Sequence, residues 1–243
     1  MSFQVFSGIY SSFAQTNADS DTVFASDRWL NKTRAHVKKA YEMGGVTEEY
    51  SLAFLAATSQ KNGKVVIVDF GGGLGDRFPM VAATLADHIT LEFHVIDNAA
   101  ACKVGRECHG DDKRIIFHES IPKNLDSAQI IHLGSVLRYI DDWQGLLGSL
   151  ASFNAPHILF SDSLIGDVPT FISVENYYGE KIPFRCLNID ELTTWLKDEL
   201  GYHLLYKSRF IQYIQGKKGF YNMDNMPEKY RLDSTMNLLF SKG

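Results

Sequence analysis

A strand-like run followed at once by a glycine-rich turn is the feature that most constrains the fold of this chain. Residues 65–68 (VVIV) form an uninterrupted apolar, β-branched run, typical of a parallel strand covered by helices on both faces. Asp69 ends the run, and Gly71, Gly72, Gly73 and Gly75 follow it. Glycines there allow positive φ angles and close approach of a ligand to the main chain. The junction therefore predicts a nucleotide-like ligand at the end of a buried strand.

The sequence around this junction alternates strand-like and helix-like segments. Alternation of this kind predicts βαβ units and a parallel sheet. We expect a three-layer, doubly wound, Rossmann-like α/β sheet of seven mostly parallel strands. Its last two strands, near 202–208 and 235–241, would form an antiparallel pair around a loop-like stretch at 210–230. The expected strands before this pair lie at 65–70, 92–97, 114–118, 128–135 and 156–162.

The expected helices lie between and before these strands. Two lie at 27–42 and 48–59, the second capped by Thr47, so that residues 1–60 form a helical N-terminal extension to a core domain at 61–243. Asn188 and Glu191 resemble a capping box that opens a helix ending at Gly201. The remaining helices are expected after Pro79, at 99–108 and at 143–153.

Composition excludes several classes of function. A net charge of -5 argues against a broad nucleic-acid-binding surface, which would need clustered Lys and Arg. Three cysteines without CxxC spacing favour a reduced, cytoplasmic protein without a zinc site. No basic leader precedes an apolar core, and no uncharged apolar stretch approaches the roughly 18 residues of a membrane helix. We therefore expect neither secretion nor a membrane span.

The glycine spacing distinguishes between cofactors. It reads Gly71-x-Gly73-x-Gly75, with Asp76 where the dinucleotide fingerprint GxGxxG has its last glycine. A ligand without phosphates tolerates an acid such as Asp69 nearby, whereas that acid would repel a pyrophosphate. S-adenosylmethionine, with cationic sulfonium and ammonium groups, meets this condition.

The second expected strand also ends on an acid, in the sequence HVIDNA. Asp97 lies where a carboxylate can accept hydrogen bonds from both ribose hydroxyls of a nucleoside. The alternative is that Asp97 only caps the following helix. We include Asp97 and its neighbour Asn98 in the predicted cofactor site.

Residues 65–162 resemble a class I S-adenosylmethionine-dependent methyltransferase. The matching pieces are VDFGGGLG, VIDN, FHESIP, HLGSVLRYIDDW and ILFSD. The resemblance implies that Ser120 and Ile121 flank the adenine, and that Gly134 and Ser135 border the methionine portion. The flanking segments FSGIYSSF, IPFRCLNIDEL and MPEKYRLDSTMNLLF are similar to a group of bacterial methyltransferases associated with surface-polysaccharide biosynthesis. The acceptor of that group does not carry over to this chain. We expect methyl transfer from S-adenosylmethionine to a small or glycan-linked acceptor, most readily at oxygen, with a place in surface-polysaccharide biosynthesis.

Removing the proton of an acceptor hydroxyl would need a base within hydrogen-bond reach. The candidates are His132, His118 and Tyr139. His132 lies in an apolar strand run, where a histidine is more often a hydrogen-bonded core residue than a base. For Tyr139, a role in core packing and a role in lining the acceptor site are equally compatible with the sequence. His132 and Tyr139 are nevertheless the predicted catalytic residues.

Other side chains are candidates for holding the acceptor. Arg138, Tyr177 and Tyr178 would position a glycan or an anionic group, with solvated or packing roles as the default. The aromatic stretch 219–230 is either an acceptor lid or a contact in a homodimer.

Two other functions use the same sequence features. A nicotinamide-dependent oxidoreductase or epimerase would also need the glycine turn and Asp97, but the glycine missing at position 76 counts against it. A methyltransferase-fold protein that has lost catalysis and serves as a binding or scaffolding subunit would keep Gly71, Gly73 and Asp97 and need no base.

Overall fold

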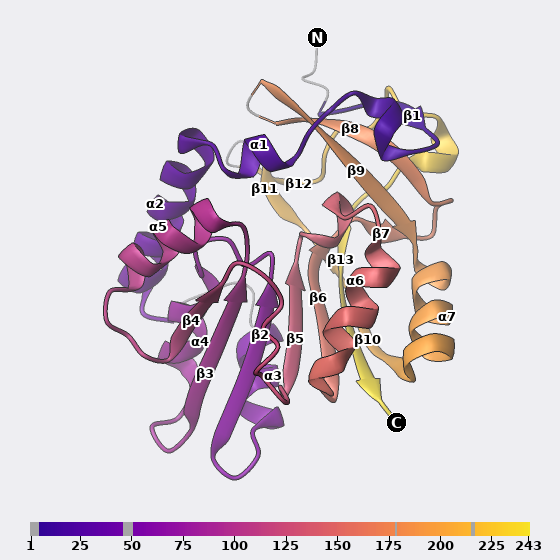
Figure 1. Ribbon diagram of the computed structural model, residues 1–243. Helices are drawn as coiled ribbons and strands as arrows, with labels where there is room; N and C mark the ends of the chain where they lie inside the picture. The colour runs from indigo at the N-terminus through magenta and orange to yellow at the C-terminus, as the bar shows by residue number, and fades with distance from the viewer. Residues whose placement is uncertain (1–4, 46–50, 178, 215–216) are drawn as a thin grey trace. The chain divides into compact units, whose positions relative to one another are not determined.

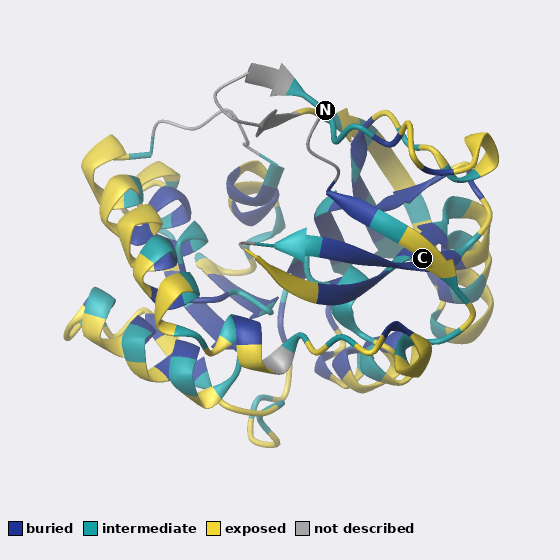
Figure 2. Ribbon diagram, turned by 90° about the horizontal axis from the view of Figure 1, so that it is seen from above, coloured by how far each residue is buried: buried dark blue, intermediate teal, exposed yellow. Residues whose placement is uncertain are grey.

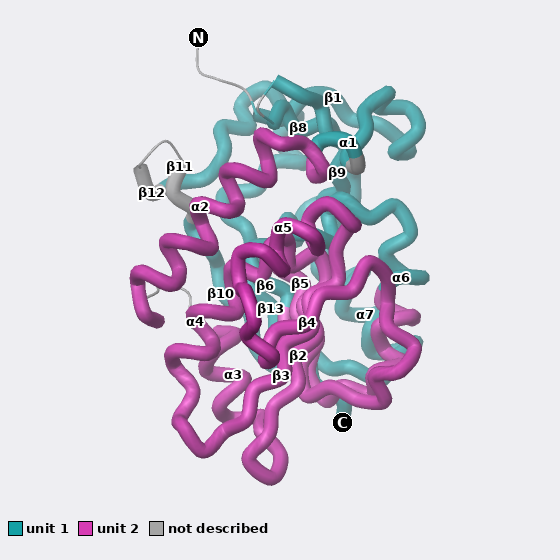
Figure 3. Tube along the Cα trace, turned by 60° about the vertical axis from the view of Figure 1, so that its left-hand side comes forward, with its two compact units in different colours: residues 1–23, 135–146, 160–243 teal, residues 24–134, 147–159 magenta. Residues whose placement is uncertain are grey.

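The computed structural model describes residues 5–45, 51–177, 179–214 and 217–243 (Figure 1). The chain divides into two compact units (Figure 3). The first comprises Met1–Val23, Ser135–Leu146 and Phe160–Gly243, and the second comprises Phe24–Gly134 and Leu147–Leu159. The first residues of the chain group with its C-terminal part, and the expected domain boundary between residues 60 and 61 stays a prediction.

The main sheet has seven strands in the order β10-β13-β6-β5-β2-β3-β4. β2 pairs in parallel with β3 and β5, and β3 with β4, whereas β10 and β13 are antiparallel. The predicted Rossmann-like sheet with an antiparallel C-terminal pair is thus confirmed. The strands are β2 (Lys64–Phe70), β3 (Thr90–Ile96), β4 (Ile115–His118), β5 (Ile130–Gly134), β6 (His157–Ser163), β10 (Tyr202–Phe210) and β13 (Thr235–Lys242).

The second unit carries the glycine turn. Its helices are α2 (Asp27–Met43), α3 (Ser51–Ser59), α4 (Arg77–Thr84) and α5 (Ala99–His109). β2 is buried along its apolar run, as expected for a strand covered on both faces. Figure 2 colours the chain by burial and shows buried residues concentrated on the inner strands and on one side of the helices. Leu74, in the glycine turn, is fully buried and packs in one cluster with Leu30 and Val37 of α2 and Ala101 of α5. This cluster fixes the turn against two helices.

The helix boundaries follow local capping chemistry. The Ser26 side chain accepts from the Trp29 N–H at the start of α2, and Gly44 ends α2 in the left-handed conformation. The proposed Thr47 cap lies outside the described residues. α4 begins at Arg77 rather than after Pro79, because a proline in the first turn removes no intrahelical hydrogen bond.

The first unit contains a second sheet, of order β1-β8-β9-β7, which the sequence analysis did not predict. The extension expected to be helical begins with strand β1 (Phe6–Tyr10), which pairs antiparallel with β8 (Phe171–Tyr177). β9 (Glu180–Asn188) pairs antiparallel with β8 along its length and in parallel with β7 (Ile165–Gly166) at its end. Short helices η1 (Phe13–Thr16) and α1 (Asp21–Phe24) follow β1.

The remaining elements complete the chain. They are η2 (Leu137–Tyr139), α6 (Trp143–Leu150), η3 (Ala151–Phe153), α7 (Ile189–Leu200), the two-stranded β11 (Gln212–Ile214) and β12 (Lys217–Gly219), and η4 (Glu228–Tyr230). The expected loop at 210–230 therefore contains a hairpin and a helical turn. Met223 and Met226 in this stretch are buried in a cluster with Phe6 and Phe184. Across the described ranges, no helix combines the length and apolar character needed to cross a membrane.

Candidate functional site

A hydrogen bond ties the glycine turn to the end of β3. Gly71 and Gly73 adopt left-handed φ angles of 67° and 57°, which side chains disfavour. The Gly73 N–H donates to Asp97 Oδ2 over 2.8 Å, and the Gly71 N–H donates to the Ile96 carbonyl over 2.8 Å. The ends of β2 and β3 therefore form one fixed edge.

Asp97 has little acceptor capacity left. Besides the Gly73 bond, Oδ1 accepts from the Asn98 backbone N–H over 2.7 Å and from Asn98 Nδ2 over 2.9 Å. A carboxylate offers about four acceptor positions, so one remains for a ligand hydroxyl. Binding both ribose hydroxyls, as predicted, would require one of these three bonds to break. Burial raises the pKa of Asp97, as does the nearby Asp69 charge, although the bonds from Asn98 and Gly73 oppose the shift.

Asn98, and not Asp97, caps the following helix. Its Oδ1 accepts from the Ala101 N–H over 3.0 Å at the start of α5. The capping alternative for Asp97 is therefore wrong. Asn98 thus stabilises the start of α5 and the position of the Asp97 carboxylate. Its contact with a cofactor stays a prediction.

Asp69 and His132 form a buried pair at the ends of β2 and β5. They are neighbours in the parallel register, each 1% exposed, and His132 Nδ1 donates to Asp69 Oδ1 over 2.7 Å. Asp69 Oδ2 is buried and has no hydrogen-bond partner among the described residues. It lies beside the bare Cα of Gly72, where a Cβ would come within 2.5 Å. Residue 72 must therefore be glycine, because any side chain there would collide with the Asp69 carboxylate.

This pair bears on the predicted catalytic role of His132. Its Nδ1 is engaged with a buried carboxylate, and a Cβ at Gly134 would come within 3.0 Å of its ring. Such an enclosed, hydrogen-bonded histidine matches the core role that the sequence favoured over a base. His132 therefore positions Asp69.

Gly75 has a packing explanation. Its φ is 77°, and a Cβ there would lie 2.7 Å from Ile115 Cδ1 and 3.0 Å from His109 Nε2. At Gly73, by contrast, a Cβ would make an ordinary 3.4 Å contact with Trp29 Cη2. Trp29 of α2 thus borders the turn, a position that the sequence analysis missed because nothing local links it to a turn 44 residues away.

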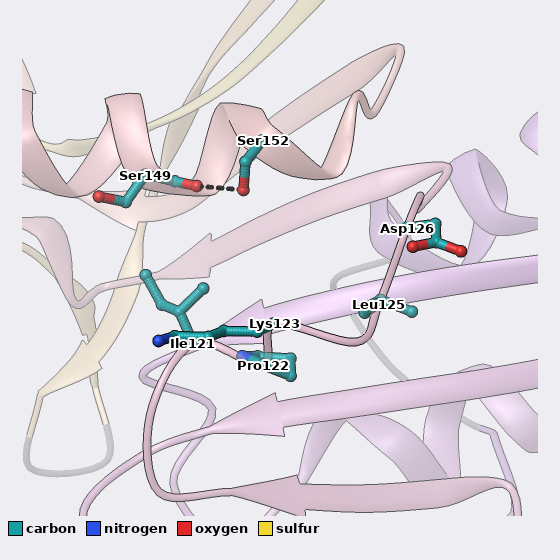
Figure 4. Close-up of a pocket in the computed structure, with 7 residues that line it drawn as sticks. All are labelled: Ile121, Pro122, Lys123, Leu125, Asp126, Ser149 and Ser152. Atoms are coloured by element: carbon teal, nitrogen blue, oxygen red, sulfur yellow. Dashed lines mark hydrogen bonds between the residues drawn. The ribbon is translucent and has the colours of Figure 1, made fainter.

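Ile121 lines a cavity that is separate from the glycine turn. The cavity has a volume of about 550 Å³, and Ile121 and Lys123 face Ser149 and Ser152 across it (Figure 4). Its other lining residues are Pro122, Leu125 and Asp126, so Gly71, Gly73 and Asp97 do not border it. Ser120 is exposed after β4. Ile121 thus lines a cavity that Asp97 does not border, and the predicted contacts of Ser120 and Ile121 with the adenine stay predictions.

His118 belongs to a polar chain on the sheet. His118 Nε2 lies 2.8 Å from His94 Nδ1, and His94 Nε2 lies 2.8 Å from Glu92 Oε1, which also pairs with Lys64. Burial lowers the pKa of His118, with His94 and Arg106 contributing. Its hydrogen bonding explains this histidine without a catalytic role.

Ser135, Arg138 and Tyr139 come together in the first unit. Ser135 has a left-handed φ of 60°, its N–H donates to the Ser161 carbonyl, and its Oγ accepts from Arg138 Nη2 over 2.8 Å. The Arg138 guanidinium lies 4.8 Å from the centre of the Tyr139 ring. The Tyr139 hydroxyl donates to Glu175 Oε2 over 2.9 Å.

Burial raises the pKa of Tyr139 well above its ordinary value, so the phenol is protonated at neutral pH. Glu175 is 3% exposed in β8, in the sheet that the sequence analysis missed. Tyr177 ends β8 and is partly exposed, and Tyr178 lies outside the described residues.

Solved structures share this architecture at low sequence identity. The complex between the Haloferax volcanii Trm112 methyltransferase activator and a methyltransferase matches with a TM-score of 0.56 and 15% identity, over 93% of this chain and 99% of that one. An S-adenosylmethionine-dependent methyltransferase from Mesorhizobium loti matches with a TM-score of 0.54 and 14% identity, over 80% and 99%. One from Methanosarcina mazei matches with a TM-score of 0.56 and 11% identity, over 81% and 99%.

The chain has the fold of a class I methyltransferase. No family model and no curated protein matches its sequence. Within this methyltransferase fold, the structure brings Asp69, the glycine turn and Asp97 to one edge of the sheet. It places Tyr139 beside Glu175, a residue that no signal in the sequence singles out.

Proposed function

We propose that this chain binds S-adenosylmethionine at the ends of β2 and β3 and transfers its methyl group to an oxygen of a small or glycan-linked acceptor. One observation carries the cofactor assignment: Asp69 Oδ2 is buried at that edge without a donor among the described residues. A buried acceptor needs a donor, and a cationic ligand would be favoured there. The anionic pyrophosphate of a nicotinamide dinucleotide would be repelled.

The other residues of this edge have compatible tasks. When bound, S-adenosylmethionine supplies a methyl group activated by a positively charged sulfur. The remaining acceptor position of Asp97 would receive a ribose hydroxyl, and Gly71 and Gly73 would offer bare main chain to the nucleoside. His132 would hold the Asp69 carboxylate in place.

For the acceptor proton, we favour Tyr139 acting with Glu175 over His132. The Tyr139 proton already points to Glu175 Oε2. If an acceptor hydroxyl donates to the Tyr139 oxygen, its proton can pass to Tyr139 while the Tyr139 proton moves to Glu175. Tyr139 then never becomes a phenolate, which agrees with its raised pKa.

The glycan part of the proposal has its support in the sequence. The flanking segment FSGIYSSF contains β1, and IPFRCLNIDEL covers most of β9 and the first residues of α7. Their resemblance to methyltransferases of surface-polysaccharide biosynthesis is the reason for proposing a glycan-linked acceptor.

Calorimetric titration tests the cofactor assignment. We expect S-adenosylhomocysteine to bind and NAD not to bind. Asp97→Asn removes one charge-assisted hydrogen bond of about 1.5–3 kcal/mol and should weaken binding roughly ten- to a hundredfold. The matched control Asp233→Asn changes an exposed carboxylate paired with Arg209 and should leave the affinity unchanged. Tighter binding of NAD than of S-adenosylhomocysteine would overturn the proposal in favour of an oxidoreductase.

A further inference from the structure

Arg138 has buried hydrogen-bond donors that none of the described residues uses. Its Nε and Nη1 are both buried and lack a hydrogen-bond partner among the described residues. Nη2 donates to Ser135 Oγ over 2.8 Å, and the Tyr221 side chain also forms a hydrogen bond with the guanidinium. Buried donors are nearly always paired in folded proteins, because leaving one unpaired costs its full desolvation. Arg138 therefore points to a ligand that supplies oxygen acceptors.

The geometry of the guanidinium indicates how many acceptors fit. Its two hydrogen-bonding edges share Nη2, so Nε and Nη1 lie on opposite sides of the nitrogen held by Ser135. Each edge retains an unused donor. Two ligand oxygens can therefore bind at once, one on each side of the Ser135 contact.

The surrounding charges decide between an anion and a neutral group. Burial lowers the pKa of Arg138, but Tyr139, Glu175, Tyr221 and Asp162 raise it, and the net shift is upward. Glu175 and Asp162 thus already balance the guanidinium. An added carboxylate or phosphate would be repelled by both. A neutral hydroxyl group is not repelled. It can accept a hydrogen bond from arginine and donate its own proton to a carboxylate.

The cover over Arg138 lies in an irregular segment. Tyr221 interacts with the guanidinium, and burial raises the pKa of Tyr221 to about 12 while Arg138 lowers it. Tyr221 belongs to residues 220–227, which form neither helix nor strand. Met223 and Met226 of this segment are buried and Asn225 holds it to the Phe6 carbonyl, so a ligand would reach Arg138 by displacement of the Tyr221 side chain alone.

We propose that Ser135, Arg138 and Glu175 form the acceptor subsite and bind neighbouring hydroxyl groups of an uncharged sugar or polyol. This inference rests on the proposed function and narrows its acceptor to a neutral, hydroxyl-rich molecule. Tyr139, the candidate for receiving the acceptor proton, contacts both Arg138 and Glu175, so hydroxyls bound by those two residues would lie next to it.

Ligand-observed saturation-transfer NMR with two sets of probes tests the subsite. The neutral probes are methyl glycosides of glucose, galactose and mannose, and the charged probes are the corresponding uronic acids, all with S-adenosylhomocysteine present. We expect the wild-type chain to bind at least one neutral glycoside in the millimolar range and the matched uronic acid more weakly. Arg138→Met should weaken glycoside binding about tenfold or more, and Arg209→Met, which removes an exposed arginine, should not change it.

Glu175→Gln separates the neutral from the anionic assignment. It should weaken glycoside binding, because a carboxylate acceptor is lost, whereas an anion receptor would bind the uronic acids more tightly after this change. Absence of glycoside binding in the wild type, unchanged binding in Arg138→Met, or preference for the uronic acids would overturn the proposal. A circular-dichroism spectrum checks that each variant is folded. Ser135→Ala is a second test variant: it keeps the guanidinium, removes the acceptor of Nη2 and should also weaken glycoside binding.

Calorimetry with S-adenosylhomocysteine keeps this test distinct from the test of the cofactor site. Arg138→Met should leave that affinity within about twofold of wild type. If the wild-type chain binds glycosides but does not bind S-adenosylhomocysteine, the methyltransferase proposal is refuted and the proposed sugar subsite is not.

Discussion

Removing His132 should expose the cost of the buried Asp69 carboxylate. Both side chains are 1% exposed, and the 2.7 Å bond from His132 is the one hydrogen bond of the Asp69 side chain among the described residues. In His132→Leu both carboxylate oxygens would be buried without a partner. Breaking a buried ionic pair from one side costs about 3–5 kcal/mol, a large part of the roughly 5–15 kcal/mol that stabilises a typical domain.

Urea denaturation of three chains measures this cost. We expect His132→Leu to lower the free energy of unfolding by about 3–5 kcal/mol with an unchanged dependence on urea concentration. The double variant Asp69→Leu/His132→Leu replaces both partners with apolar groups of similar size and should recover much of the loss. A loss below about 1 kcal/mol in the single variant, or a double variant less stable than the single one, would refute the reasoning.

Three further predictions concern packing, capping and pH. Gly75→Ala should destabilise the chain by about 2–5 kcal/mol, because the added Cβ would lie 2.7 Å from Ile115 Cδ1 and the residue has a left-handed φ. Gly148→Ala, whose Cβ would meet no atom within 4 Å, is the control and should not destabilise it. Equal denaturation midpoints for the two variants would contradict this prediction. Asn188→Ala removes the acceptor for two N–H groups of α7 and should cost about 1 kcal/mol in the same assay, and no loss would mean that the cap is dispensable. Because burial raises the pKa of Asp97, the folded chain holds that proton more tightly than the unfolded chain, and the stability this provides is lost as pH rises through the raised pKa. Asp97→Asn lacks this term, so its stability relative to wild type should increase from about pH 4 to pH 7, and a constant difference would contradict the shift.

The sequence predicted the main sheet because its signals are local. The β-branched run before Gly71 indicates a buried parallel strand. The βαβ pattern predicts that the first two strands lie side by side in parallel, with an acid at the end of each. The same chain order places Asp69 and Asp97 at one edge. The pairing of Asp69 with His132 was not predicted, since it depends on the register of strands 63 residues apart.

The second sheet was missed for identifiable reasons. Pro183 lies within β9 and argues against a strand, yet β7 pairs only with Leu187 and Asn188, so the missing N–H at Pro183 breaks no bond on that side. Gly8, with a φ of 78°, interrupts the pattern of β1 at an irregular register. The contact of Tyr139 with Glu175 depends on this sheet and could not be read from the sequence.

A crystal structure of the chain soaked with S-adenosylhomocysteine tests the central claim most directly, because it distinguishes the proposed site from the separate cavity that Ile121 lines. We predict density at the ends of β2 and β3, with a ribose hydroxyl on Asp97 and the amino group toward Asp69 Oδ2. Density confined to the cavity between Ile121 and Ser152, or no density at saturating ligand, would contradict the account.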